Sequence, residues 1–318
     1  MSEGHPYERL LPETVLAAVE AQGYATDGHL QALNSFENRV YQLGLEDGTF
    51  VVAKFYRPER WSDAQIEEEH AFVRELVAAE IGVVAALADA NGRSLFHHDG
   101  FRVAVFPRRG GRAPELEGLE VAQWMGRTLG RLHAVGAAQR FTHRARFDVE
   151  QLVRAPALEV LEGPLLPGSL ERRYEVVADA AADAIDAAWS AIAPATLRLH
   201  GDCHPGNVLW TDAGPTLVDF DDARSGPAVQ DLWMLMTGGV AQREALLEGY
   251  EQFRPFDRGE LALIEPLRLM RQVHYGGWIS SRWDDPAFPA AFPHAGTARW
   301  WDEHVDDLER AVAAFDAE

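Results

Sequence analysis

Two polar motifs joined by a short stretch of strand-forming residues constrain the fold of this chain more than any other feature. The first is HGDCHPGN, residues 200–207, and it runs directly into the apolar residues VLW. The second is DFDD, residues 219–222, and it follows the turn TDAGP and the apolar residues TLV. A turn between two apolar runs favours a β-hairpin. The two motifs should therefore meet at the open end of one hairpin.

The first motif contains residue types that bind zinc or act as nucleophiles. His200, Cys203 and His204 could bind zinc, but structural zinc sites need four ligands, and no second Cys/His pair follows. Cys203 as a nucleophile would need a base and usually an oxyanion hole, and only the neighbouring histidines suggest one. An ordinary polar turn with a hydrogen-bonded aspartate is the plainest alternative.

Phosphoryl transfer explains more of the pattern. The spacing H-x-D-x4-N places Asp202 and Asn207 as in a kinase catalytic loop, and Asp219 follows at the end of a strand, where kinases place a metal-binding aspartate. Asp202 would accept the hydrogen bond of the attacking hydroxyl group as the catalytic base. Asn207 and Asp219 would supply the hard oxygen ligands that Mg²⁺ prefers.

The upstream sequence offers the cation that such a site needs. Lys54 lies among the apolar residues of the strand-like run VVAKFY, and lysine is scarce in this chain. We predict that Lys54 binds the nucleotide phosphates and is held by a helix glutamate. The helix expected from Asp63 carries three successive glutamates; Glu69 falls on the apolar stripe and is our choice, with Glu68 second.

Two further segments are candidates for nucleotide contacts. A Gly-rich loop is absent before the Lys54 strand, and NSFENRVY, residues 34–41, stands in its place. Ser35 and nearby backbone amides could reach phosphate oxygens, although a polar hairpin tip is the alternative. Phe106 and Arg108 lie at the end of the strand-like run RVAVF, where their position indicates the hinge that docks adenine through backbone hydrogen bonds.

The pattern along the chain predicts an α+β, bilobal fold. The first third alternates antiparallel strand-like hairpins with one helix. Residues 108–118 are rich in Gly, Pro and charge and form the best hinge. We therefore expect a small β-rich N-lobe at 1–107 and a larger, mainly helical C-lobe at 119–318. Helical periodicity in the C-lobe predicts helices at 121–136, 170–193, 229–236, 243–253 and 261–282.

On these motifs the chain resembles a known family. HGDCHPGN with VDFDDA is similar to the phosphotransferases that include aminoglycoside phosphotransferases, choline kinases and homoserine kinases, which share a protein-kinase-like fold. Longer blocks, such as DDARSGPAVQDLWML and RWDDPAFP, resemble a bacterial stress-response branch of that family over about residues 33 to 290. The resemblance implies an ATP- and Mg²⁺-dependent serine/threonine protein kinase, monomeric and cytoplasmic, that acts in stress survival.

The same resemblance implies residue roles. Asp202 would be the base, Asn207 and Asp219 the magnesium ligands, Asp219 also an active-site residue, and Ser35 an ATP contact. Gly201 replaces the arginine that precedes the base in eukaryotic kinases, and no glycine follows Phe220. A phosphate-switched activation loop is therefore not expected. The sequence leaves open the roles of Asp221, Asp222 and Asp231.

Charge and composition narrow the partners. The formal net charge of −21 opposes nucleic-acid binding, although arginines could still form a local basic groove. No apolar run approaches the roughly 20 residues of a membrane span, and the N-terminus lacks the pattern of a signal peptide. A single cysteine fits a reducing compartment, so we expect a cytoplasmic location.

Two alternative functions stay open. A small-molecule kinase could recognise a cationic metabolite through acidic residues, which include Glu265, Asp284, Asp285 and the Asp221–Asp222 pair. An inactive nucleotide-binding scaffold is the second alternative. The complete set of polar residues argues against it, since loss of activity usually leaves gaps in such a set.

Overall fold

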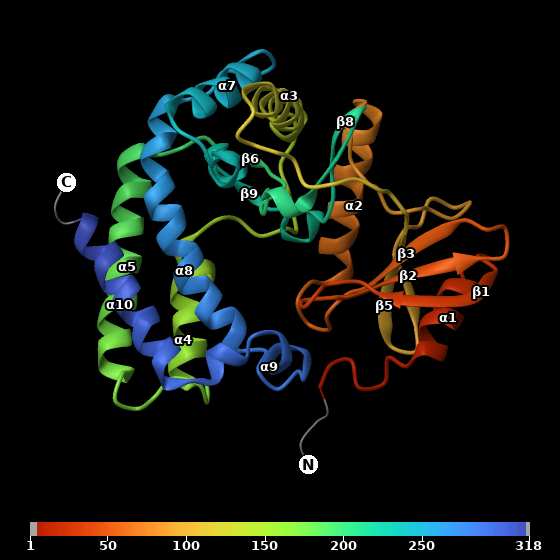
Figure 1. The fold of residues 1–318 in the computed structure, drawn as a ribbon, viewed down its shortest axis with the longest axis horizontal. Helices are drawn as coiled ribbons and strands as arrows, with labels where there is room; N and C mark the ends of the chain where they lie inside the picture. Colours follow the sequence, from red (N-terminus) through yellow and green to blue (C-terminus); the bar gives the residue numbers. More distant parts are fainter. Residues whose placement is uncertain (1–4, 316–318) are drawn as a thin grey trace. The chain divides into compact units, whose positions relative to one another are not determined.

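The structure, a computed structural model, describes residues 5–315, which form two compact units (Figure 1). Unit 1 consists of Met1–Ala145 and Thr196–Phe256, and unit 2 consists of Arg146–Ala195 and Asp257–Glu318. Unit 1 contains the whole of the predicted N-lobe and hinge; the lobe boundaries themselves stay a prediction. A five-stranded antiparallel sheet with a mainly helical remainder confirms the predicted α+β class.

A five-stranded antiparallel sheet organises the first part of unit 1. Its strand order is β1-β2-β3-β5-β4. The predicted hairpins are present, and β1 is an edge strand that pairs with β2. The strands are β1 (Thr26–Ala32), β2 (Arg39–Leu45), β3 (Phe50–Phe55), β4 (Phe96–His98) and β5 (Phe101–Pro107).

Side-chain alternation along β3 decides where Lys54 points. Ala53 and Phe55 are buried in the core that the sheet shares with α1 (Pro12–Glu20), a helix that we did not predict. Successive side chains of a strand point to opposite faces, so Lys54 belongs to the other face. There it pairs in register with Ala104, whose small side chain lies in the second core cluster.

Helix α2 (Asp63–Ala78) covers that second face. It begins as the sequence predicts, and its N-terminus is fixed by a capping box in which the Ser62 hydroxyl and the Gln65 side chain each bond to the other's backbone. The helix buries Ile66, Phe72 and Leu76. It also buries Glu69, so the carboxylate predicted to lie on the apolar stripe faces the interior of unit 1.

The hairpin predicted between the two polar motifs is present. It consists of β7 (Val208–Thr211) and β8 (Gly214–Leu217). Backbone hydrogen bonds tie Trp210 to Arg112 on one side and Leu217 to residues 82–84 on the other. The hairpin is therefore held by backbone from both flanks, which fixes the two motifs at its open end.

The remaining elements of unit 1 support this hairpin. They are α3 (Leu119–Gly136), β6 (Leu197–Arg198), the 3-10 turns η2 (Pro205–Asn207) and η3 (Phe220–Asp222), β9 (Ser225–Gly226), α6 (Val229–Leu232), η4 (Trp233–Leu235) and α7 (Val240–Glu251). Strands β6 and β9 pair with each other. Helices α3 and α7 lie side by side (Figure 1), and a Cβ atom at Gly126 would stand 1.9 Å from the Leu246 carbonyl oxygen.

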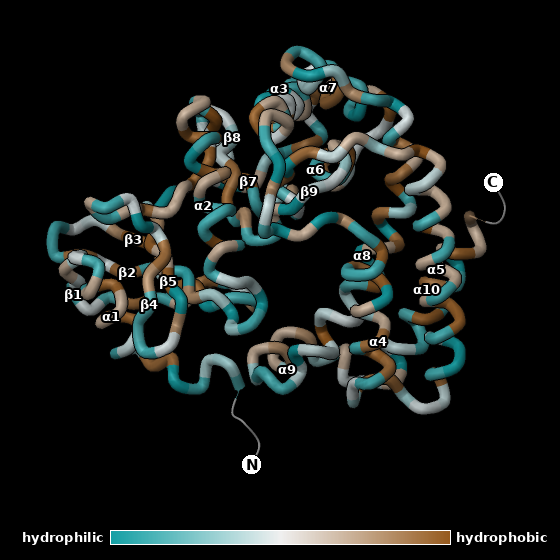
Figure 2. The backbone as a smooth tube through the Cα atoms, turned by 180° about the vertical axis from the view of Figure 1, so that it is seen from behind, coloured by the Kyte–Doolittle hydropathy of each residue, from teal (hydrophilic) through white to brown (hydrophobic). Residues whose placement is uncertain are grey.

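Unit 2 is helical. Its elements are the π-helical turn η1 (Glu150–Arg154), α4 (Ala155–Glu162), α5 (Glu171–Ile192), the 3-10 helix η5 (Arg258–Leu263), α8 (Ile264–Ser280), α9 (Ala287–Ala291), η6 (Pro293–Gly296) and α10 (Ala298–Phe315). Along helices α5, α8 and α10, hydrophobic residues alternate with hydrophilic ones, as they do in amphipathic helices (Figure 2). Within residues 5–315, no helix is both long and apolar enough to cross a membrane.

The close approach of α3 and α7 leads to a prediction about the stability of the fold. We expect Gly126→Ala to lower the free energy of unfolding by about 1–3 kcal/mol, because the added methyl group forces the two backbones apart. Urea unfolding followed by circular dichroism measures this. Gly110→Ala, in an exposed segment with no atom closer than 3.6 Å to the added Cβ, is the control and should change little. Equal midpoints for both variants would contradict the packing argument.

Candidate active site

A buried carboxylate fixes the loop that carries the first motif. The backbone N–H groups of His200 and Gly201 each donate to Asp231 at 2.8 Å, and His133 Nε2 lies 3.0 Å from the same carboxylate. Burial opposes ionisation of Asp231, but the hydrogen bond and charge of His133 outweigh it and lower the pKa. The sequence leaves the role of Asp231 open, and these contacts support a role in bracing the loop.

The backbone conformation of Gly201 explains why no arginine precedes Asp202 in this chain. Its φ of +88° is a left-handed conformation that side chains disfavour, and a Cβ atom would lie 1.9 Å from the Asp222 carbonyl oxygen. A residue larger than glycine would therefore push the loop away from the second motif.

His200 links the two motifs. Its Nε2 lies 2.9 Å from the Val218 carbonyl oxygen, and its ring centroid is 4.4 Å from that of Phe220. A carbonyl oxygen only accepts, so Nε2 carries the proton and Nδ1 accepts the Asp202 N–H at 3.4 Å. Both nitrogens are committed to the protein.

Cys203 is a buried residue of this loop. Burial, with the nearby Asp231 and Asp202 charges, raises the pKa of its thiol well above the ordinary value. A thiolate is the form that attacks a substrate or binds a metal. With His200 also committed, the nucleophile and zinc interpretations of the motif lose their support.

The hairpin brings Asn207 beside Asp219. The Asn207 carbonyl oxygen accepts the Val218 N–H at 3.0 Å, directly before Asp219. The Asn207 side-chain nitrogen donates to the Asp202 carbonyl oxygen at 2.9 Å, so the amide oxygen is the atom that can serve as a ligand. An amide oxygen and a carboxylate are the hard donors that suit Mg²⁺. The Asp219 side chain is 53% exposed, which leaves its second oxygen accessible.

Asp219 itself has an unfavourable backbone conformation. Its φ of +61° lies in the left-handed region, which costs a non-glycine residue roughly 1–2 kcal/mol. The turn lets the chain leave β8 and enter η3 at once. The surrounding contacts of Phe220 and Asp221 hold the turn in place.

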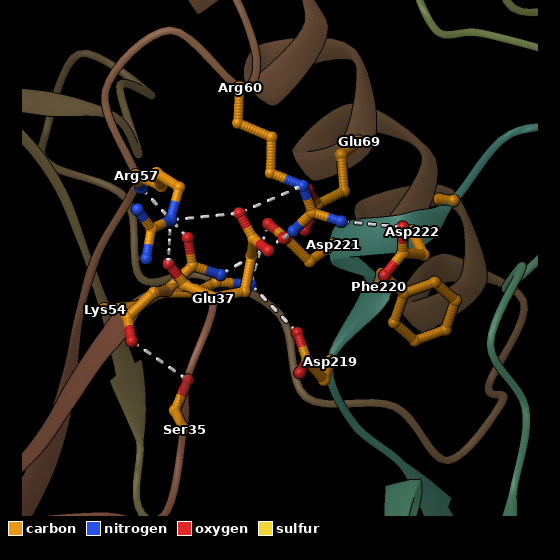
Figure 3. Close-up of polar contacts among 12 residues, drawn as sticks. Ser35, Glu37, Lys54, Arg57, Arg60, Glu69, Asp219, Phe220, Asp221 and Asp222 are labelled. Atoms are coloured by element: carbon orange, nitrogen blue, oxygen red, sulfur yellow. Dashed lines mark hydrogen bonds and ion pairs between the residues drawn. The ribbon is translucent and has the colours of Figure 1, made fainter. Parts of the chain in front are cut away.

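Lys54 reaches this segment from the sheet. Its ammonium group lies 2.9 Å from Asp219 Oδ1 and 3.0 Å from Asp221 Oδ1 (Figure 3). Burial favours the neutral amine, but the two carboxylates prevail and raise the pKa of Lys54 well above its ordinary value. Lys54 is the only lysine in the sequence. A cation thus stands opposite the predicted metal ligands.

The two candidate glutamates have other neighbours. Glu68 accepts backbone N–H bonds from Thr142, His143 and Arg144 at 2.6–2.8 Å. Glu69 Oε2 lies 3.6 Å from Arg144 Nη2. Within residues 5–315, the ion pairs of Lys54 are with Asp219 and Asp221, and Glu69 contributes to its charge environment only as a more distant group.

The other predicted contacts lie on the sheet and its loops. Ser35 is in the loop between β1 and β2, and its hydroxyl donates to the Asn38 carbonyl oxygen at 3.2 Å. Phe106 is half-buried on the face of β5 that Lys54 shares, in register with Val52. Arg108 is exposed just after β5. Their roles toward a nucleotide stay predictions.

Several residues of the site were missed by sequence reasoning. Arg144 donates to the carbonyl oxygens of Phe220, Asp221 and Ala223, and its guanidinium stacks on Trp61 at 4.1 Å. Arg60 pairs with both Asp221 and Asp222. The sequence alone does not identify these arginines as residues of the site, because in the sequence each of them resembles an ordinary surface arginine. Only the folded structure shows their contacts.

Comparisons with known proteins identify the family to which this chain belongs. The family model described as "Phosphotransferase enzyme family" matches residues 29–264. Stress response kinase A of Escherichia coli (strain K12) is 45% identical over 299 residues, which cover 93% of this chain and 90% of that protein. The chain belongs to the phosphotransferase enzyme family. The predicted resemblance to its bacterial stress-response branch is confirmed.

Two more comparisons add to this membership. The protein named "Serine/threonine protein kinase RdoA" of Salmonella typhimurium is likewise 45% identical, over 93% of this chain and 90% of its own. The structure titled "Amicoumacin kinase hAmiN in complex with AMP-PNP, Ca2+ and Ami" has a TM-score of 0.69 and 18% identity, and it covers 92% of this chain and 93% of that one. The latter likeness shows the fold, and the predicted protein-kinase-like class is confirmed. This phosphotransferase thus has the fold and the relatives of a kinase.

The environment of Glu69 predicts a pH-dependent stability. Burial raises the pKa of its carboxyl group from 4.5 to about 7, against the lowering effect of Lys54 and Arg144. The folded state therefore keeps a proton that the unfolded state loses, and this contribution is full below pH 4.5 and lost as pH rises through about 7. Glu69→Gln cannot ionise, so it should gain about 1–3 kcal/mol relative to the native protein between about pH 5 and pH 8.

Urea unfolding at several pH values measures the difference between the two proteins. Glu67→Gln, an exposed position on the same helix, is the matched control and should show no such trend. Parallel stability curves for Glu69→Gln and the native protein would show that the Glu69 carboxyl group titrates normally.

Proposed function

We propose that this phosphotransferase is an ATP- and Mg²⁺-dependent serine/threonine protein kinase that acts in a stress response. The observation that carries the catalytic part is the meeting of Lys54, Asp219 and Asn207 around the Asp202 loop. The acceptor class is supported by the 45% identity with a protein named as a serine/threonine protein kinase. The stress role is supported by the name of the Escherichia coli relative.

Each residue has a role that its contacts support. Asp202, in a loop held by Asp231 and His200, accepts the proton of the attacking hydroxyl group. Lys54 binds the oxygens of the nucleotide phosphates and offsets their charge. Asn207 and Asp219 would hold Mg²⁺, which when bound neutralises charge on the phosphates. Ser35 and the backbone of its loop would contact the phosphates from the sheet side.

Positioning does most of the work in such a site, because phosphoryl transfer asks little covalent chemistry of the protein. The loop that carries Asp202 is hydrogen-bonded to the Asp231 carboxylate and to the Val218 carbonyl oxygen. Asp202 therefore needs no activation event to reach its place, and we propose that the enzyme is assembled without phosphorylation.

We expect Asp202→Asn to lower kcat by roughly 10²–10⁴-fold with little change in ATP affinity, because the amide cannot accept the proton. Steady-state kinetics with varied ATP separates the two constants. A variant in which only the KM for ATP changes would assign a binding role to Asp202 instead.

The function is tested by incubating the protein with labelled ATP, Mg²⁺ and two sets of acceptors, namely mixed protein substrates and a panel of amino-alcohol and aminoglycoside metabolites. We expect label on protein Ser or Thr. Asp219→Asn should abolish transfer, because asparagine tolerates the left-handed backbone but lacks the charge for a metal. Asp212→Asn, in the exposed turn of the same hairpin, should remain active.

The outcomes discriminate between the functions. Label confined to metabolites would replace the proposal with a small-molecule kinase. No transfer to either set would favour a nucleotide-binding scaffold. Full activity of Asp219→Asn would reject the assigned metal ligand.

A further inference from the structure

We propose that Asp221 is a positioning residue that orients the Lys54 ammonium group and fastens the phosphate-covering loop, residues 33–38, to the same point. The inference rests on the proposed function, because both segments are assigned there to the nucleotide. It gives a role to a carboxylate whose purpose the sequence leaves open.

Asp221 contacts three side chains from the N-terminal part of unit 1, and each of them is distant from Asp221 in the sequence. Its Oδ1 lies 3.0 Å from the Lys54 ammonium group on β3. Its Oδ2 accepts the Asn38 side-chain N–H at 3.1 Å and also pairs with Arg60, which follows β3. Figure 3 shows Lys54, Arg60 and Asp221 gathered at the end of the segment that carries Asp219.

Asp219 is the less suitable carboxylate for holding Lys54. Its side chain is 53% exposed, whereas that of Asp221 is 4% exposed. A contact that water can replace constrains an ammonium group weakly, and an enclosed ion pair constrains it strongly. Asp219 is in addition the proposed metal ligand, so its oxygens have another task.

The helix glutamates are also less suitable. Glu68 is committed to the backbone of residues 142–144, and Glu69 lies beside Arg144. Within the part of the chain that the structure describes, the Lys54 ammonium group forms its ion pairs with Asp219 and Asp221. Asp221 therefore takes the orienting role that the sequence predicts for a glutamate of α2.

The same carboxylate controls the covering loop through Asn38. The Asn38 side chain accepts the Arg57 backbone N–H at 3.0 Å while it donates to Asp221, so both ends of its amide are fixed. The Ser35 hydroxyl donates to the Asn38 carbonyl oxygen. A short chain of contacts thus runs from the proposed ATP contact at Ser35 to Asp221 and on to Lys54.

The test is the affinity of a fluorescent ATP analogue in the presence of EDTA, which reports binding by Lys54 and the loop without any metal. We expect Asp221→Asn to weaken it by about tenfold or more, because removing one partner disrupts an enclosed ion pair. Asp222→Asn is the matched control. Asp222 lies in the same turn and also pairs with Arg60, but it contacts neither Lys54 nor Asn38, so we expect less than about a twofold change.

A double-mutant cycle separates positioning from mere stability. If Asp221 acts through Lys54, Asp221→Asn should add little to the loss already caused by Lys54→Met. Thermal melting of each variant monitors folding. Should Asp221→Asn not fold, Asp221→Glu, which keeps the charge but moves it by one methylene, should weaken binding in the same direction.

The outcomes keep this inference apart from the proposed function. If the native protein binds the analogue neither in EDTA nor with Mg²⁺, the proposed function fails, and this inference fails with it. If it binds with Mg²⁺ but not in EDTA, the proposed function stands and this inference alone is overturned. If the native protein binds it but Asp221→Asn equals Asp222→Asn, or if the losses from Asp221→Asn and Lys54→Met add fully, the inference alone is overturned. Native affinity in Asp221→Glu would overturn it as well.

Discussion

The pairing of the Lys54 ammonium group with the carboxylates of Asp219 and Asp221 is the interaction on which the site depends. A buried ammonium group is strongly disfavoured unless opposite charges surround it. The sheet supplies the ammonium group and the segment after the β7–β8 hairpin supplies the carboxylates, so the ammonium group cannot be buried beside them until both parts of unit 1 are in place. The electrostatic requirement and the geometry of the site are therefore the same constraint. The paired charges contribute specificity of arrangement even where their net effect on stability is small.

A second constraint fixes the loop opposite this cation. Asp231 accepts two successive backbone N–H bonds, and His200 bonds to Val218, so the loop is held from below and from the side. Gly201 permits the close approach because no side chain separates it from Asp222. A loop fixed in this way carries its aspartate in one place. For the proposed base Asp202 this matters, because a small displacement of a catalytic group costs much of the advantage of proximity.

Residues that are close in sequence or follow a simple periodicity were predictable. Asp202, Asn207 and Asp219 meet because a tight hairpin joins them, and the orientation of Lys54 away from Ala53 and Phe55 follows from alternation along a strand. Helix α10 was also readable, since Trp301, Val305 and Leu308 recur at helical spacing, yet it was not predicted. The roles of Asn38, Arg60 and Arg144 could not be predicted from the sequence. Their partners at 220–223 lie far along the chain, and only tertiary structure brings a surface-like arginine to a buried carboxylate.

The composition of the chain gives Lys54 a further meaning. Apart from histidine, every other basic side chain in the sequence is arginine, so a lysine at one buried position indicates a need that arginine does not meet. An arginine fork is broad and planar and favours fixed bidentate pairing, whereas an ammonium group is compact and forms its bonds in any direction. At position 54 the cation fits opposite Ala104 and between two carboxylates at 2.9 and 3.0 Å. In the proposed role, a compact charge can turn from one carboxylate to a phosphate oxygen while the other carboxylate still holds it, and a guanidinium locked to both could not.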